Sequence, residues 1–169
     1  MEALETIFTR HSIRRYTPTP IPDSLVTEIL QAAMSAPSAG NQQPWQIVVV
    51  ANRLLREEIT TFHPYAQMVR AAPVAILVYG DLRLESYQGY RVQDCSAATQ
   101  NILLAAHAKG PGAVWVGVYP KEDRVARFQE LLGLPAQVIP LALVPLGFPA
   151  EHLPSANRFN AARVHRDRW

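Results

Sequence analysis

Apolar residues recur along this chain in two patterns, one typical of helices and one typical of buried strands. Helical spacing begins after Pro22 and predicts a helix that starts at Asp23 or Ser24 and ends before Pro37. Gly133 stands at the C-cap position of a later helix. The same spacing predicts this helix over residues 122–132. It predicts three others, over residues 4–8, 53–61 and 93–108.

Short continuous apolar runs predict four strands between these helices. The runs at residues 46–51 and 74–79 are expected to be buried, and a third strand is expected over residues 113–118. The fourth run, residues 138–146, contains Pro140 and Pro145. Because proline cannot donate a hydrogen bond to a neighbouring strand, we expect this strand at an edge of the sheet or near its end.

Two features point to a partner subunit. The helix predicted over residues 93–108 is apolar on most of its sides, so we expect a second chain to cover part of it. Residues 148–169 show no periodicity, yet they include Phe159, Val164 and Trp169 as apolar anchors. A purely disordered tail usually lacks such anchors, so we expect an ordered C-terminal arm that packs on another subunit.

The composition narrows the class of protein. The 169 residues, 49% of them apolar, suffice for a single domain over residues 1–169. A net charge of +2 lacks the clustered basic excess that nucleic-acid binding requires. The longest apolar stretch, residues 138–150, is interrupted by prolines and is too short to span a bilayer. One cysteine, Cys95, excludes an internal disulfide, and the chain starts with acidic rather than basic residues, so we expect a cytoplasmic protein.

Residue spacing excludes several kinds of site. The sequence contains no GxxxxGKS phosphate loop, no GxGxxG fingerprint and no GxSxG elbow. Its five histidines lack the spacing of metal ligands, so we expect no metal site. Cys95 lies inside a predicted helix, where we expect a small buried side chain rather than a nucleophile.

Two segments carry candidate chemistry. The first is RHSIRRY, residues 10–16. Guanidinium groups bind phosphate through two parallel hydrogen bonds, and a serine hydroxyl adds another donor. In an extended segment, Arg10, Ser12 and Arg14 point the same way and could line one groove. A solvated basic patch is the alternative for this segment taken alone.

The second segment is the proline-bracketed loop PSAGNQQPW, residues 37–45. Its amide side chains offer both donors and acceptors, which suits the edge of a planar heterocycle. Its small residues would let a flat ring lie close to the backbone. A polar turn is the alternative here, since Gly-Asn is a common turn pair.

Taken together, the two segments resemble the FMN-dependent nitroreductase family. The resemblance continues along the chain through DCSAATQNILLAA, GAVWVGVYP, ELLGLP, LGFPAE and RVHRDRW. It implies a nitroreductase-like α+β fold in which a mostly antiparallel sheet is flanked by helices. It also implies an extended C-terminal arm and an entwined homodimer with FMN at the subunit interface.

The resemblance implies that FMN is bound by Arg10, His11, Ser12, Arg14, Pro37, Ser38, Asn41, Val116, Gly117 and Arg158. Arg10 and Ser12 would contact the phosphate and ribityl end, and Arg14 the pyrimidine edge of the ring. The loop at residues 37–41 would reach FMN from the other subunit, and the backbone around Gly117 would approach the isoalloxazine. Arg158 would reach the phosphate.

One position departs from the family pattern. Some members carry a second cation two residues before Arg158, where this chain has Ala156. The phosphate would then depend on Arg10 and Arg158, and we expect weaker binding.

The activity that the resemblance implies is an oxidoreductase in which NADH or NADPH reduces FMN and leaves. A nitroaromatic, a quinone or a similar small acceptor then enters the same site. The flavin performs the hydride chemistry, so we expect no catalytic side chain. The alternatives are a specialised relative that reduces enones, removes halogens or breaks down flavin, and a non-catalytic dimer that binds or senses FMN.

Overall fold

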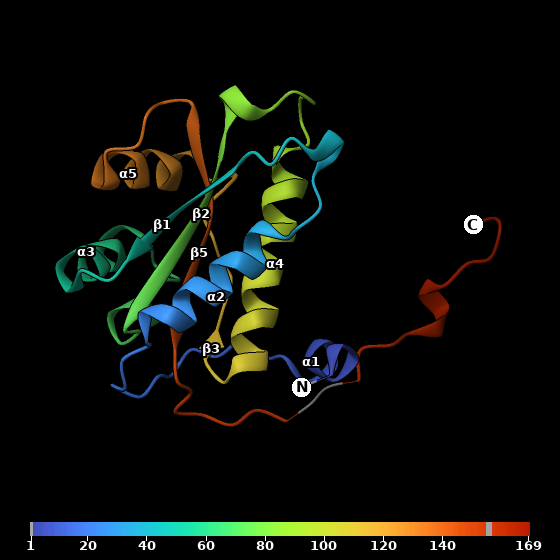
Figure 1. Ribbon diagram of the computed structural model, residues 1–169, viewed down its shortest axis with the longest axis horizontal. Coiled ribbons are helices and arrows are strands. Elements are labelled where there is room, and N and C mark those ends of the chain that lie inside the picture. The colour runs from blue at the N-terminus through green and yellow to red at the C-terminus, as the bar shows by residue number, and fades with distance from the viewer. Residues whose placement is uncertain (1, 155–156) are drawn as a thin grey trace.

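The computed structural model describes residues 2–154 and 157–169, with a central sheet between two layers of helices (Figure 1). The α-helices are α1 (Ala3–Thr9), α2 (Asp23–Met34), α3 (Arg53–Phe62), α4 (Arg91–Lys109) and α5 (Glu122–Leu132). The strands are β1 (Trp45–Val50), β2 (Val74–Asp81), β3 (Gly112–Ala113), β4 (Val116–Gly117) and β5 (Val138–Gly147). Short 3-10 turns are η1 (Ala39–Asn41), η2 (Gln67–Arg70), η3 (Leu82–Leu84) and η4 (Ala161–Arg163).

The strands of the sheet pair antiparallel in the order β1-β2-β5-β3, and β4 also pairs with β5. The predicted antiparallel sheet flanked by helices is confirmed. Two cores fill the layers. One lies between the sheet and the helices α2 and α4, and the other lies between the sheet and the helices α3 and α5.

The position predicted for the proline-containing strand is wrong, because β5 lies inside the sheet between β2 and the pair β3 and β4. The prolines occupy irregular points of the pairing. The register between β2 and β5 shifts beside the pair Tyr79 and Pro140. Pro145 falls between the paired residues Leu143 and Leu146, where the partner strand is interrupted. A bulge and a break remove the need for an N–H donor at these points.

Two further strand predictions need correction. The strand predicted over residues 113–118 is divided into β3 and β4 by the same interruption. The first predicted strand, residues 46–51, is only partly buried, because β1 lies at an edge of the sheet and Val49 is 40% exposed. By contrast, β2 is buried along most of its length, as expected.

Helix α4 packs on α2 and on the sheet. It ends at Gly110, whose φ of 108° suits a residue without a side chain. Cys95 is fully buried in α4, and this burial raises the pKa of its thiol to about 12, so the expected structural role is confirmed. Other apolar residues of α4, among them Ala97 and Leu104, are only half-buried. Coverage of this side by a second chain stays a prediction.

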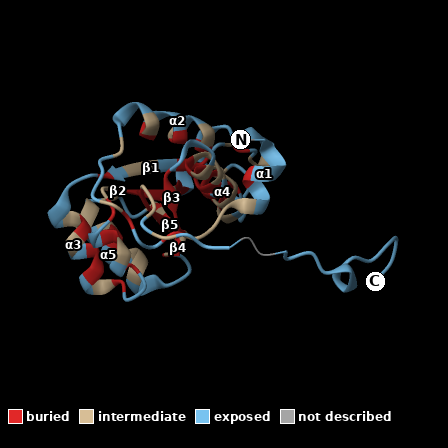
Figure 2. Cartoon of the chain, turned by 90° about the horizontal axis from the view of Figure 1, so that it is seen from below, coloured by how far each residue is buried: buried red, intermediate tan, exposed pale blue. Residues whose placement is uncertain are grey.

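The C-terminal segment begins on the chain's own surface and then leaves it. Residues 148–150 pair with residues 15–17 through two backbone hydrogen bonds of 2.8 Å. All residues of 157–169 are exposed. Residues 157–159 lie beside α1, and the rest of this segment extends away from the helices and the sheet (Figures 1 and 2). Phe159 is 76% exposed, and Trp169 is fully exposed and stacks against His165. The predicted packing of these anchors on a partner stays a prediction.

Candidate functional site

The arginine-rich segment lies in extended form beside β3. Ser12 forms a parallel bridge with Ala113, and the N–H of Ile13 donates to the carbonyl of Ala113 at 3.0 Å. Gly112 permits this close approach, because a Cβ at Gly112 would lie 2.6 Å from the side chain of Ile13. The edge of the sheet therefore holds the backbone of the segment, while its arginine side chains remain available.

Arg10 lines a hollow of about 780 Å³ between α1 and the start of the arm. Burial, and next the charge of Arg158, lower the pKa of the Arg10 guanidinium, which still remains charged. Among the described residues that line this hollow, none is acidic. Two like charges without a carboxylate between them form a site suited to an anion. The hollow is lined by Ile7, Phe8, Thr9, Arg10, His11, Asn157, Arg158 and Phe159.

Arg14 lines a second hollow, of about 450 Å³, together with Val116 and Gly117. Within one chain, Arg10 and Arg14 thus line two hollows rather than the single groove that we expected. Glu151 fixes the backbone of Arg14, because its carboxylate accepts the Arg14 N–H at 2.6 Å. The remaining lining residues are His63, Pro64, Tyr65, Gln67, Met68, Val114, Trp115 and Arg124.

Gly117 forms an open part of the wall of this second hollow, since a Cβ added there would meet no atom within 4 Å. Its carbonyl oxygen has two donors. The Nε2 atom of His63 lies 3.0 Å from it, and the Nη1 atom of Arg124 also lies 3.0 Å from it. His63 is fully buried, and burial above all lowers the pKa of its imidazole, which favours the neutral form. Arg124 also stacks over the ring of Tyr65, 5.4 Å from its centroid.

Sequence reasoning missed His63 and Arg124 as members of this site. Each is a single polar residue far from the motifs in sequence, and only the fold brings α3, α5 and β4 together. In the sequence, His63 is only one of five histidines without the spacing of metal ligands. It is buried, with one ring nitrogen hydrogen-bonded and the other, Nδ1, without a partner among the described residues.

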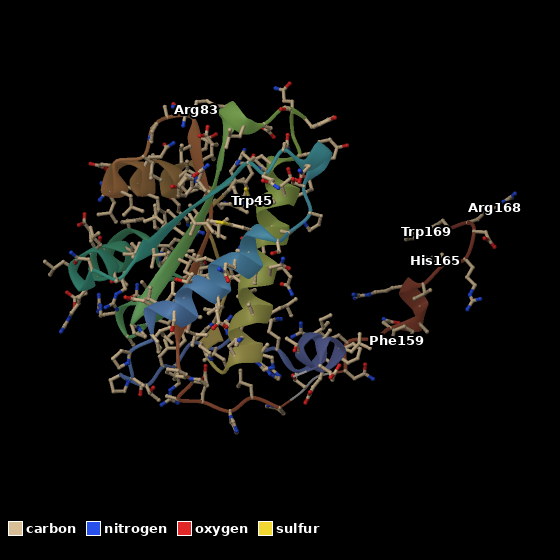
Figure 3. The ribbon with its side chains drawn as sticks, viewed as in Figure 1. Trp45, Arg83, Phe159, His165, Arg168 and Trp169 are labelled. Carbon is tan, nitrogen blue, oxygen red and sulfur yellow. The ribbon has the colours of Figure 1, made fainter. Side chains whose placement is uncertain are left out.

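The amide-rich loop is rigidly built. Its turn η1 contains residues with positive φ, Gly40 at 53° and Asn41 at 57°. Ser38 Oγ accepts the N–H of Gln43 at 3.0 Å, and Asn41 Oδ1 accepts from the Gln43 amide at 3.0 Å. Pro37 at the start of the loop is exposed. The loop continues into Trp45, which is buried in the core against α4 (Figure 3).

The loop and the arginine-rich segment lie at opposite ends of α4 (Figure 1). Asp94, in the first turn of α4, accepts a hydrogen bond from the N–H of Ala39 at 3.0 Å. His107, in the last turn, bonds to the hydroxyl of Thr9 at 2.8 Å. His107 follows Asp94 by thirteen positions, which is about 20 Å along a helix axis. The structure therefore does not bring the two candidate segments together within one chain.

Other features bear on the remaining predictions. Within residues 2–154 and 157–169, no group of His, Cys, Asp and Glu is arranged to hold a metal ion. Across the same described part of the chain, no helix is long and apolar enough to cross a bilayer. Ala156, at the position where a second cation was considered, lies outside the described residues.

Comparison with known proteins decides the family. Residues 7–148 match the Nitroreductase family. This chain belongs to the nitroreductase family. A relative from Methanothermobacter thermautotrophicus, provisionally named NADH dehydrogenase/NAD(P)H nitroreductase, is 50% identical over 169 residues, covering 100% of this chain and 88% of the relative.

Solved structures of nitroreductase-like proteins agree. A Bacteroides thetaiotaomicron protein with the same provisional name has 38% identity and a TM-score of 0.95, covering 99% of this chain and 98% of that chain. A provisionally named nitroreductase from Desulfovibrio desulfuricans, solved in complex with FMN, has 34% identity and a TM-score of 0.87. That match covers 100% of this chain and 98% of the other. The resemblance and the α+β nitroreductase fold are thus confirmed.

Proposed function

We propose that this nitroreductase-family enzyme binds FMN and transfers hydride from NADH or NADPH to small acceptors such as nitroaromatics and quinones, and that it works as a homodimer. The names of its relatives support the nucleotide and nitro compounds as acceptors, and the Desulfovibrio desulfuricans structure with FMN supports the cofactor. The geometry of this chain supports the cofactor site and the dimer, as follows.

The observation that carries the proposal is the pair Arg10 and Arg158 on one hollow. Both are cations, burial already lowers the pKa of Arg10, and no acidic residue among the described lining offsets them. A dianionic phosphate would relieve this repulsion and accept hydrogen bonds from both guanidinium groups. The residues present therefore fit the phosphate end of FMN, even though Ala156 supplies no further charge.

The second hollow, lined by Arg14 and Gly117, fits the isoalloxazine end of FMN. Gly117 leaves the wall open to a flat group, and Arg14 places a guanidinium at the same hollow. When bound, FMN would supply the hydride chemistry, the transfer of two electrons and a proton from the nucleotide toward the acceptor. In this chain, Arg14 would hold the pyrimidine edge and favour negative charge there, while Ser12 would hydrogen-bond the ribityl end. No side chain needs to act as nucleophile or acid.

The opposite placement of the two candidate segments supports the dimer. The loop is held at one end of α4, whereas Arg10 follows Thr9, which bonds to His107 at the other end of the same helix. A second chain that packs along the half-buried side of α4 would supply its own Pro37, Ser38 and Asn41 to the neighbouring site. The exposed arm, with Phe159 and Trp169, would then find apolar surface on that partner.

Anaerobic spectroscopy of the purified protein tests the proposal. We expect a yellow protein whose released cofactor has the mass of FMN, and whose flavin absorbance bleaches on addition of NADH or NADPH. Subsequent addition of a nitroaromatic or a quinone should restore the colour. FAD or no flavin would contradict the cofactor. Bound FMN that neither nucleotide bleaches would instead support the non-catalytic binding dimer, and recovery only with an enone or a halogenated acceptor would support a specialised relative.

A further inference from the structure

We propose that His63 and Arg124 form a two-donor clamp on the carbonyl oxygen of Gly117, and that this clamp positions the Gly117 backbone and fixes a positive charge beside the FMN ring. The inference rests on the proposed function, because it assigns roles toward a bound flavin. It names two positioning residues that no sequence motif indicated. Neither is proposed to touch the reacting atoms.

A glycine at this position needs an external restraint. Gly117 has open space where a Cβ would stand, which lets a flat ring lie close to the backbone. The same lack of a side chain gives glycine more backbone freedom than any other residue. β4 is only two residues long, so its own ladder offers little restraint. Two hydrogen bonds of 3.0 Å to the Gly117 carbonyl supply the missing restraint.

The strand pairing directs Gly117 toward these donors. Val118 donates its N–H to the carbonyl of Leu141 at 3.0 Å, so those two residues face each other across the ladder. Neighbouring residues of an antiparallel pair alternate in direction, and the polar groups of Gly117 therefore point away from β5. The carbonyl points to the side where α3 ends and α5 begins.

The two donors lie at helix ends that the fold holds in place, and they differ in charge. His63 follows α3 directly, and its N–H donates to Ile59 at the end of that helix. Arg124 lies in the first turn of α5 and is held by Tyr65 below its guanidinium. The cation of Arg124 is therefore fixed 3.0 Å from the Gly117 oxygen, on the hollow that Arg14 also lines. Two cations around one hollow favour added negative charge within it.

Fold stability alone does not call for a histidine at position 63. The ring is fully buried next to Phe128, and its Nδ1 atom has no partner among the described residues. An unpaired buried polar atom costs free energy that an apolar side chain of similar size would avoid. The Nε2–H group that reaches Gly117 is what distinguishes histidine from leucine at this place. Burial also lowers the pKa of the ring beside Arg124, which favours a neutral donor over a second positive charge at this place.

Matched variants of the FMN-loaded protein test the clamp. His63→Gln keeps an N–H donor near the Nε2 position, whereas His63→Leu keeps only the volume. Arg124→Lys keeps the charge, whereas Arg124→Met keeps only the stem. Arg127→Met is the control, since Arg127 lies on the same helix but bonds to Glu130 and stacks on Phe62. The readouts are the FMN dissociation constant, the flavin reduction potential and the melting temperature.

We expect His63→Leu to weaken FMN binding roughly three- to tenfold, the loss that one neutral hydrogen bond predicts, and His63→Gln to restore most of it. We expect Arg124→Met to lower the reduction potential, and Arg124→Lys and Arg127→Met to stay near the wild-type potential. If His63→Leu does not fold, the comparison of Arg124→Met with Arg124→Lys tests the clamp instead.

Unchanged affinity and potential in folded Arg124→Met and in any folded His63→Leu protein would overturn the clamp. So would equal effects of Gln and Leu at position 63, because a merely structural role does not depend on the donor. Failure of the wild-type protein to bind FMN would instead contradict the proposed function, and that outcome is visible before any variant is made.

Discussion

The carboxylate of Asp94 accepts a hydrogen bond from the backbone N–H of Ala39 at 3.0 Å. Asp94 is only 4% exposed, and its second oxygen accepts from the side-chain amide of Gln42 at 2.6 Å. One buried side chain of α4 therefore holds the whole amide-rich loop in place. The conformation of the loop is set within its own chain, before any partner or cofactor contacts it.

Asp94→Ala should loosen this loop. The substitution leaves the Ala39 N–H and the Gln42 amide without their acceptor, and we expect a loss of about 1–3 kcal/mol in the free energy of unfolding. FMN affinity should fall as well, since the loop would no longer be preformed for the neighbouring site. Chemical denaturation and flavin titration measure both effects. Gln100→Ala, an exposed change on the same helix, is the control and should alter neither.

Arg14→Ala should change the flavin more than it changes the fold. Removing a cation from the hollow disfavours the more negatively charged reduced cofactor, so we expect a lower reduction potential and slower reduction by the nucleotide. Losing this charge interaction should cost the reduced flavin about 1–3 kcal/mol of stabilisation. Potentiometry with reference dyes checks this, with the exposed neighbour Arg15→Ala as control. A wild-type potential in an Arg14→Ala protein that still binds FMN would reject this role.

The helices and the type of fold could be predicted from the sequence because they depend on local spacing. Helix α2 begins at Asp23, and α5 spans Glu122–Leu132 with Gly133 in the left-handed conformation at its C-cap, both as the pattern indicated. The order of the strands could not be predicted, since it depends on contacts between distant residues. The prolines of β5 therefore predicted an edge position wrongly. A bulge and an interrupted partner strand accommodate them inside the sheet.

The candidate site could likewise be predicted only where its residues lie close together in the sequence. The motifs identified Arg10, Arg14 and the amide-rich loop, because such chemistry is concentrated in short segments. They gave no indication of His63 or Arg124, which converge on Gly117 only after α3, α5 and β4 pack together. Isolated polar residues of this kind carry no pattern in a single sequence.

Truncation after Leu153 should release the cofactor and loosen the dimer together. It removes Arg158, one of the two cations of the phosphate hollow, and also the exposed anchors Phe159 and Trp169. Cofactor and partner are expected to bind in a linked manner, so each loss should worsen the other. Sedimentation and flavin content measure both. A truncated protein that stays flavin-replete and tightly dimeric would show that the arm is dispensable.

The stability of the protein should fall in acid partly through His63. Burial lowers the pKa of this imidazole in the folded protein below its usual value of 6.5, and the nearby charge of Arg124 acts in the same direction, while Asp123 opposes it. The unfolded chain therefore takes up a proton at a higher pH than the folded chain does. This contribution is fully present above that usual value and is lost as the pH falls toward the folded pKa.

Unfolding free energies at about pH 7.5 and about pH 5 check this expectation. The decrease between the two should be smaller in His63→Gln than in the wild type. His165→Gln, in the exposed arm, is the matched control and should keep the wild-type decrease. A decrease of equal size in His63→Gln would assign the acid sensitivity to other groups, of which His107 is the first candidate because burial lowers its pKa as well.

The central claim is that each FMN site takes its arginines from one chain and its amide-rich loop from the other. Subunit complementation tests it directly, with two variants that each lose FMN as homodimers. One carries Arg10→Ala and Arg14→Ala. The other carries Ser38→Asp and Asn41→Asp, which place negative charge in the loop.

The measurement is the flavin content of the mixed dimer, purified through a different tag on each chain. A site shared between chains gives a mixed dimer with one site free of substitutions and one site with all of them, so we predict one FMN per two chains. A site built within a single chain leaves a defect in both sites. A mixed dimer as empty of flavin as its parents would contradict the account.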